Sequence, residues 1–381
     1  MIMAASHYAG DTGKGHMSAN GRIRPMRPDD VEAVGKLFMQ VFRQSEAPPS
    51  RALSDYFRLV CFGAPAYGED VGSIVHEDAE GVVDGAITIT PIRFVCGDMV
   101  LTGRELANYM ADDTKGRKGA TDLALTLRAR NQDLAFSETA RPVSADMVKA
   151  MGAVILPIQS LEWTRVFRPC GAVVRLMQRR GGVYARIPAM PLAKLGDLVA
   201  TRVFKRLDPP REGVVAGPVE RDEFVALAPQ MVAHYGLRPL WEPAELNWLI
   251  DRAAERTRNG PLVLRKVTDG RGTVIGLAAY LGGPGMIANV LNILARKNRE
   301  VEVIGALLAL MDAEGNVAAR GTAQPIQLEA MCRIPGMLFR HNAYSYVLSK
   351  HAAVVDAARR NDIYMGGLAG EGWSRLVSET F

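Results

Sequence analysis

The sequence predicts a mixed α/β (α+β) protein with two domains, each built on a mixed, mostly antiparallel central sheet flanked by helices. Three observations lead to this fold class. The chain has 381 residues, which is enough for two domains of ordinary size. Hydrophobic residues make up 48% of it, so both domains can bury a sizeable core. Patterns of strand, turn and helix run from residue 22 to about 168, and the same order starts again near residue 214.

The first repeat begins with two helical patterns. In "RIRPMRPDDVEAVGKLFMQVF" a short strand and a turn precede a helix, which Asp29 or Asp30 can cap. The apolar residues of this helix share one face: Val31, Val34, Leu37, Phe38 and Val41. The stretch "SDYFRLVCF" predicts a second helix. We therefore expect a strand and two helices before the central sheet.

The rest of the first repeat reads as a sheet interrupted by two helices. Strands follow the second helix and are broken by "DAEG" and "CGD" turns. A helix is expected over roughly residues 119–130, then a strand in "DLAFSETA" and a short helix in "SADMVKAMG". The stretch "AVILPIQSLEWTRVF" predicts one more strand region.

The second repeat copies this order. "VVAGPVERDEFVALAPQMVAHYG" again reads as strand, turn and helix, "AELNWLIDRAAERT" as the second helix, and "GPLVLRKVTDGRGTVIGLAAYLG" as the hairpin. Val31 matches Phe224 at an offset of 193 residues, and Gly85 matches Gly276 at an offset of 191. Two nearly equal offsets favour a duplicated domain.

Composition sets apart the start of the chain and the region between the repeats. Residues 1–20 lack the apolar centre of a secretory signal, and we interpret them as a flexible extension. Residues 165–211 hold 11 Lys and Arg against 2 acids, a net charge of +9, while the whole chain carries +5. The basic character is therefore local, which argues against a nucleic-acid partner. The expected division is this extension, a domain at 21–168, a basic linker at 169–213 and a second domain at 214–381.

Membrane, redox and metal signals are weak. Leucine and valine recur at helical spacing among basic residues in the 192–207 segment, which fits a linker helix or a weak contact with a membrane surface. No apolar run reaches the ~18 residues of a membrane-spanning helix. No metal is expected, because the histidines lack ligand spacing. The cysteines lack paired spacing, so we expect buried, inert thiols and a cytoplasmic location: Cys61, Cys96, Cys170 and Cys332.

One stretch, "DDTKGRKGATDLALTLR" at residues 112–128, places basic residues and glycines at a predicted helix start. A helix start exposes unpaired N–H groups and carries partial positive charge. Lys115, Arg117 and Lys118 add repulsion there unless an anion binds in the turn. Gly116 and Gly119 permit a close approach of the backbone to that anion. The stretch therefore indicates an anion site, and phosphate groups suit its chemistry.

With this turn, the order of elements in residues 22–168 resembles the GNAT acyltransferase superfamily. The signature of that family is a strand that runs into an Arg/Gln-x-x-Gly-x-Gly/Ala turn and a helix, where backbone amides hold the pyrophosphate of acetyl-CoA. Aligned on Gly119, Gly116 stands at the Arg/Gln position and Thr121 at the last Gly/Ala position. Only the middle glycine therefore matches the strict pattern.

The resemblance implies a site for acetyl-CoA, or another acyl-CoA, as co-substrate and no metal. The residues that it places at this site are Met110, Ala111, Lys115, Gly116, Arg117, Lys118, Gly119, Ala120 and Thr121. Acyl transfer also needs groups that move protons, and the catalytic candidates are Glu105, Tyr109 and Glu138, with Ser137 beside the last. The tyrosine that often serves as acid in the family is Val148 here, so Tyr109 is the candidate substitute. A structural role is equally compatible with Glu105, Ser137 and Glu138.

The corresponding turn of the second repeat carries Arg296, Lys297 and Arg299 but no glycine. We therefore expect a degenerate GNAT-like domain that completes the acceptor pocket or packs against the first. Four polar and aromatic residues near its end either line a polar cleft or belong to a strand with alternating faces: Arg340, His341, Tyr344 and Tyr346.

These features predict an N-acyltransferase, in particular an acetyltransferase, that moves an acyl group from CoA to an amine by direct attack. The acceptor is expected to be a small-molecule or sugar amine, and a homodimer is compatible with the sequence. Two alternatives stay open. One is an aminoacyl transferase of the FemAB type on the same architecture. The other is a non-catalytic protein that binds an acyl-CoA or acts as a scaffold.

Overall fold

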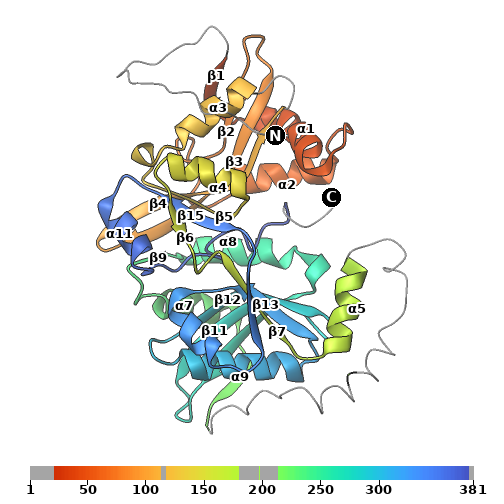
Figure 1. Cartoon of the computed structure of the whole chain (residues 1–381), viewed down its shortest axis with the longest axis vertical. Coiled ribbons are helices and arrows are strands. Elements are labelled where there is room, and N and C mark those ends of the chain that lie inside the picture. Colours follow the sequence, from red (N-terminus) through yellow and green to blue (C-terminus); the bar gives the residue numbers. More distant parts are fainter. Residues whose placement is uncertain (1–20, 113–116, 180–196, 198–212, 377–381) are drawn as a thin grey trace.

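The computed structural model describes residues 21–112, 117–179, 197 and 213–376. Two mixed sheets flanked by helices form the molecule, as the sequence predicted (Figure 1). The helices are α1 (Val31–Arg43), α2 (Arg51–Phe62), α3 (Arg117–Thr126), α4 (Pro142–Ala150), α5 (Pro169–Arg179), α7 (Arg221–Met231), α8 (Pro243–Ala254), α9 (Glu300–Ala313), α10 (Pro325–Cys332) and α11 (Ala352–Arg359).

The first sheet has the strand order β1-β2-β3-β4-β5-β15-β6, and β9 pairs with the far end of β3. Its only parallel pair among the described strands is β4 with β5. The strands are β1 (Arg22–Pro25), β2 (Ile74–Glu77), β3 (Val83–Cys96), β4 (Met99–Ala111), β5 (Leu134–Ala140), β6 (Val154–Leu156), β9 (Leu237–Pro239) and β15 (Tyr344–Leu348).

The second sheet has the order β8-β10-β11-β12-β13-β7-β14. It repeats the plan of the first sheet, because its parallel pair, β12 with β13, again joins the fourth and fifth strands in that order. The strands are β7 (Leu161–Val166), β8 (Val215–Pro218), β10 (Leu262–Thr268), β11 (Val274–Leu281), β12 (Ile287–Ala295), β13 (Ala318–Thr322) and β14 (Met337–His341).

The two halves of the chain exchange one strand. β15 comes late in the chain, yet it lies between β5 and β6 in the first sheet, and β7 lies between β13 and β14 in the second. Figure 1 shows the blue β15 among the orange and yellow strands of the first sheet. The predicted domain limits at residues 168 and 214 therefore do not coincide with the division between the sheets. β7, which precedes residue 168, belongs to the second sheet, and β15, which follows residue 214, belongs to the first.

The registers of the two sheets match in detail. Gly103 pairs with Leu134 in the first sheet, and Ile287 pairs with Ala318 in the second, so both strands of the parallel pair are offset by 184 residues. The last residues of β4 and β12 face glycines: Ala111 faces Gly85, and Ala295 faces Gly276. The match of Gly85 with Gly276 predicted from the sequence is therefore present in the structure. In both places a Cβ would press on the following helix, 2.8 Å from Leu123 Cδ1 and 2.4 Å from Val303 Cγ1.

The α1 helix shows how the local patterns work and where they fail. Val31, Val34, Leu37 and Phe38 are buried as expected, but Val41 is 37% exposed because it lies near the end of the helix. Neither predicted aspartate caps α1 with its side chain.

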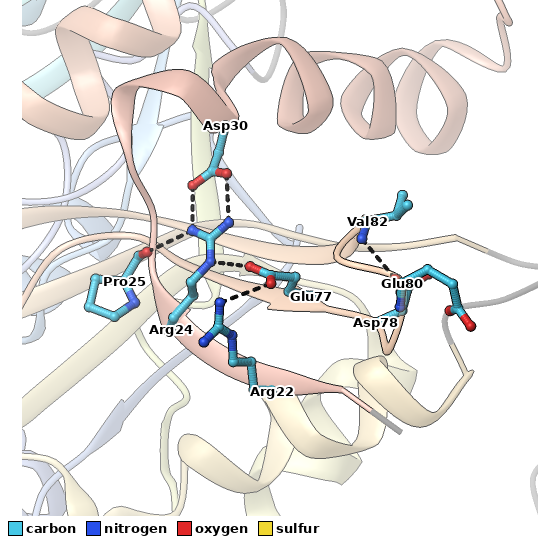
Figure 2. A network of polar contacts seen from close by, with 8 residues as sticks. All are labelled: Arg22, Arg24, Pro25, Asp30, Glu77, Asp78, Glu80 and Val82. Atoms are coloured by element: carbon cyan, nitrogen blue, oxygen red, sulfur yellow. Dashed lines mark hydrogen bonds and ion pairs between the residues drawn. The ribbon is translucent and has the colours of Figure 1, made fainter. Parts of the chain in front are cut away.

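Asp30 instead accepts two hydrogen bonds from the guanidinium of Arg24, at 2.6 and 2.8 Å (Figure 2). Arg24 also bonds Glu77, whose other oxygen accepts from Arg22 at 3.0 Å. This network fastens β1 and β2 to the start of α1.

One large apolar core joins the two halves. It contains Phe94 and Phe136 from the first sheet together with Leu291 of β12, Trp241 before α8 and Tyr364 near the chain end. Among the cysteines, Cys61 and Cys96 are buried, while Cys332 is exposed, which corrects the expectation of four buried thiols. No helix in the described ranges is long and apolar enough to cross a membrane.

Candidate active site

The candidate site begins where β4 and β5 separate. They pair in parallel only over three positions, and the last pair is Glu105 with Phe136. A shift of register between β3 and β4 leaves Ala107 as an extra residue in β4. A bulge of this kind bends its strand, so β4 diverges from β5 beyond Glu105. We call this separation the first gap.

A cluster of carboxyl groups lies where the first gap opens. Glu371, from the C-terminal segment (residues 362–376), accepts hydrogen bonds from Ser137 Oγ at 2.9 Å and Thr139 Oγ1 at 2.6 Å. Its backbone N–H donates to Glu138 Oε2 at 2.6 Å. Glu105 is fully buried on the other strand of the gap, and the charge of Glu371 acts on its carboxyl group. The C-terminal segment therefore brings three glutamates together.

Burial disfavours the charged form of these carboxyl groups and so raises their pKa values. It raises the pKa of Glu138 to about 8, and the negative charge of Glu371 adds to the shift. Burial and the charge of Glu371 also hold the pKa of Glu105 well above its usual range. The pKa of Glu371 is raised by burial as well, although hydrogen bonds from Thr139 and Ser137 favour its charged form. Near neutral pH the cluster therefore holds protons that it can exchange.

A cavity of about 310 Å³ lies between the sheets and reaches this cluster. Glu138 and Thr139 of β5 and Glu371 line one part of it. The other parts come from residues 159–162, from β12 and β13, from the turn after β14 and from the C-terminal segment. We call it the inter-sheet cavity. Its volume is at the lower end of the range for small-molecule sites.

Three charged residues of the second sheet form a row on the cavity wall. Arg340 of β14 faces Glu162 of β7 directly, and its Nη2 lies 2.9 Å from Glu162 Oε1. Arg320 of β13 lies on the other side, with Nη1 3.6 Å from Glu162 Oε2 and Nε donating to Asn289 Oδ1 at 2.8 Å. We call Arg320, Glu162 and Arg340 the arginine row. The sequence left open whether Arg340 lines a polar cleft or belongs to a strand, and in the structure it does both.

The predicted catalytic residues divide into two groups. Glu105 and Glu138 meet in the carboxyl cluster, and Glu138 also lines the inter-sheet cavity. Tyr109 lies apart from that cavity, because its hydroxyl donates to the carbonyl of Ala120 in α3. Burial raises the pKa of Tyr109 to about 12. This tyrosine therefore holds α3 on β4.

The described members of the predicted cofactor site lie at the end of β4 and in the first turns of α3. Met110 is buried at the end of β4, Ala111 follows it, and Ala120 and Thr121 lie in the first turns of α3. Arg117 and Lys118 begin the same helix, and Lys115 and Gly116 lie outside the described residues.

Gly119 faces inward rather than into the gap. A Cβ on it would lie 2.5 Å from Nδ1 of His76, which is buried and bonds Asp84. Its small size is therefore needed for packing α3 on the sheet.

Sequence reasoning missed Glu371. Its signal was the glycine-rich stretch "GGLAGEGW" that surrounds it. A Cβ on Gly370 would lie 2.0 Å from Glu138 Oε2, and one on Gly366 2.5 Å from Glu138 Oε1. The glycines thus permit the C-terminal segment to wrap closely around Glu138. Within the described ranges, no group of three or more His, Cys, Asp or Glu is placed to hold a metal ion.

Comparisons with known proteins agree with this architecture. No family model matches the chain, and no curated protein does. Among solved structures, a GCN5-related N-acetyltransferase from Anabaena variabilis matches with a TM-score of 0.55 and 12% identity, over 86% of this chain and 72% of that one. A probable N-acyltransferase from Enterococcus faecalis matches with a TM-score of 0.54 and 10% identity, over the same shares. The chain therefore has the fold of GCN5-related (GNAT) N-acetyltransferases, as the sequence resemblance implied.

Proposed function

We propose that the protein is an acyl-CoA-dependent N-acyltransferase, with acetyl-CoA as the expected donor and a small amine as the acceptor. One observation carries this proposal: the carboxyl cluster touches both strands of the first gap and also lines the inter-sheet cavity. A donor in the gap and an acceptor in the cavity would meet at groups that can take a proton. The GNAT fold of the chain supports the same assignment.

The donor would lie in the first gap with its phosphates at the start of α3. Beyond Glu105, the edge of β4 that faces the gap pairs with none of the described strands, so its backbone groups would be open to the pantetheine arm. The first turn of α3 contains no acidic residue among those described, and it begins with Arg117 and Lys118. A helix start of this composition favours a bound anion.

The reaction would be a direct transfer. The amine nitrogen attacks the thioester carbonyl carbon, the new C–N bond forms, and the C–S bond then breaks to release the CoA thiolate. Glu138 would take the proton that the amine loses, since a base with a pKa of about 8 is well matched to neutral pH. A backbone N–H of β4 near Met110 would stabilise the oxyanion of the tetrahedral intermediate. The thiolate takes its proton from solvent.

One alternative has a specific observation in its favour. Val148 is buried in the core, and the hydroxyl of Tyr109 is already bonded to α3, so neither supplies an acid for the leaving thiolate. A protein that binds acyl-CoA without turnover would need no such acid. Release of free thiol in the presence of an amine separates the two functions.

The donor site can be tested by titration with acetyl-CoA, longer acyl-CoAs and free CoA, followed by calorimetry and thermal shift. Thr121→Glu places a negative charge in the first turns of α3, where the side chain is exposed. Its matched control is Leu125→Glu, because Leu125 is 40% exposed and lies one turn further along the same face. We expect Thr121→Glu to weaken binding about tenfold or more, and Leu125→Glu to change it by less than about twofold.

The acyl-CoA that binds most tightly identifies the preferred chain length. If no CoA species stabilises the wild type, the proposal is wrong. If both variants weaken binding equally, a donor binds the protein but its phosphates lie elsewhere.

A further inference from the structure

The arginine row has features of a ligand site as well as of a surface ion-pair ladder. Its three members come from neighbouring strands and lie on one face of the second sheet. Glu162 is largely covered, with its side chain 16% exposed, while the side chains of Arg320 and Arg340 are 32% and 66% exposed. One carboxylate therefore fixes two guanidinium groups that still reach the cavity. This is the pre-organised arrangement that bidentate recognition of an anion requires.

The charges of the cavity wall do not cancel. In the row, two arginines face one glutamate, which leaves a net charge of +1. Arg256 lines the same cavity, where it bonds the carbonyl of Gly372. On the far side, burial raises the pKa of Glu138 to about 8 and also raises the pKa of Glu371, so at neutral pH these acids offset only part of this charge. A ligand that fits both ends would carry a basic group toward the acids and an anionic group toward the row.

We propose that the acceptor is an amine that also carries a carboxylate, an amino acid in the broad sense, with its carboxylate on Arg320 and Arg340 and its amine facing Glu138. This assignment rests on the proposed function for the transfer, but not for the binding. Two guanidinium groups held side by side by one carboxylate suit the two oxygens of a ligand carboxylate, and phosphate and sulfonate analogues are separate arms of the test. The cavity of about 310 Å³ has room for a molecule of this size.

The test is a direct binding measurement on the full-length protein without any acyl-CoA. Glycine, β-alanine and γ-aminobutyrate separate the amine from the carboxylate by increasing lengths, and L-leucine and L-phenylalanine add side chains. Each is paired with the amine that lacks its carboxylate. Taurine and phosphoethanolamine replace the carboxylate by other anions. Calorimetry should detect binding of at least one carboxylate-bearing amine and a loss of about tenfold or more in affinity for its decarboxylated partner.

Two variants connect this preference with the row. Arg340→Gln and Arg320→Gln keep a polar side chain but remove the charge, and each should raise the Kd of the best carboxylate ligand about tenfold or more. The same variants should leave the Kd of the decarboxylated amine within about twofold. Arg333→Gln is the matched control, since Arg333 is an exposed arginine that pairs with Glu329 on α10, outside the cavity. It should bind like the wild type.

Several outcomes would overturn the inference. These are equal binding of amines with and without the carboxylate, tighter binding of the phosphate or sulfonate analogue, no binding of any carboxylate-bearing amine, or unchanged affinity in both arginine variants. Binding that depends on the row, without thiol release when acyl-CoA is added, would support this site and reject the proposed transfer. The two proposals therefore fail separately.

Discussion

Each sheet has a gap beyond its parallel strand pair: the first gap between β4 and β5, and a second gap between β12 and β13. The two gaps are built from matching strands, but different groups of the C-terminal segment occupy them. Each lies beyond a short parallel pair and a bulge, at Ala107 in β4 and at Leu291 in β12. In the first gap, the C-terminal segment contributes the carboxyl group of Glu371. In the second, its backbone fills the space, because Leu368 N–H donates to Asn292 Oδ1 at 2.8 Å and a Cβ on Gly367 would lie 1.9 Å from the carbonyl oxygen of Leu291.

The helices behind the gaps differ in the same sense. The first turn of α3 contains no acidic residue, whereas α9 begins with Glu300 and Glu302. Glu300 accepts from the N–H of Asn298 at 3.0 Å, and Glu302 pairs with Arg299. At the place where a ligand anion would bind, the second half thus supplies its own carboxylates. We infer that the first gap binds the donor, while the second gap is filled by the C-terminal segment and holds that segment in place.

The largest expected effect concerns the filled gap. Gly367 has a φ of +63° and no room for a side chain, so Gly367→Ala must displace the C-terminal segment from Leu291. We expect a loss of about 4 kcal/mol or more in the free energy of unfolding, measured by urea denaturation. Gly272→Ala is the control, because Gly272 has a φ of +78° but nothing within 4 Å of its Cβ position. It should cost only about 1 kcal/mol. Equal losses of unfolding free energy in the two variants would mean that the second gap does not hold the C-terminal segment in place.

The next largest effect concerns the first gap and the role of Glu138 in the reaction rate. Because this carboxyl group is protonated below a pKa of about 8, a base at this position predicts that kcat/KM rises as the pH approaches 8 and then levels off. Glu138→Gln should lower kcat/KM about 100-fold and remove this ionisation from the profile. The acceptor amine also titrates, so both proteins are compared with the same acceptor.

Glu245→Gln is the matched control for Glu138→Gln. Glu245 is also buried, and burial raises its pKa to about 7, but it accepts from the N–H of Arg93 outside the inter-sheet cavity. Its replacement should leave both kcat/KM and the pH profile unchanged. An identical profile for wild type and Glu138→Gln would remove Glu138 from the reaction.

Much of the framework could be predicted because it is local. Helix faces, turns and the repeated order depend on residues close in the chain, and the offset of Gly85 and Gly276 reflects a real correspondence of register. The exchange of β7 and β15 could not be predicted. Both are short strands whose partners, β13 and β5, lie far away in the chain, and a local pattern does not select one sheet over the other.

The candidate site, like the fold, could be predicted from the sequence only in part. Glu105 and Glu138 lie on strands that the pattern located, whereas Glu371 reaches Glu138 across 233 residues of chain. Gly119 shows a further limit. A glycine signals a close approach, but the sequence does not say of what, and here the neighbour is His76 of the adjacent strand rather than a phosphate.

The smallest effect compares two asparagines at matching positions. Asn108 of β4 and Asn292 of β12 both follow the bulge and are offset by the same 184 residues. The amide of Asn108 donates to Thr88 Oγ1 at 3.0 Å, within its own sheet. The amide of Asn292 instead donates to Tyr364 Oη at 2.9 Å and to the carbonyl of Gly366 at 3.0 Å, and it also accepts from Leu368.

Asn108→Ala should therefore lower the free energy of unfolding by about 1 kcal/mol, and Asn292→Ala by about 3 kcal/mol, because three buried partners lose their hydrogen bonds together. Urea denaturation of both variants gives the difference. Limited proteolysis adds a second readout, since only Asn292→Ala should expose the C-terminal segment to cleavage. Equal losses and equal protection would show that the asparagine of the second gap stabilises its sheet as the first does, so the glycine contacts alone would have to hold the segment.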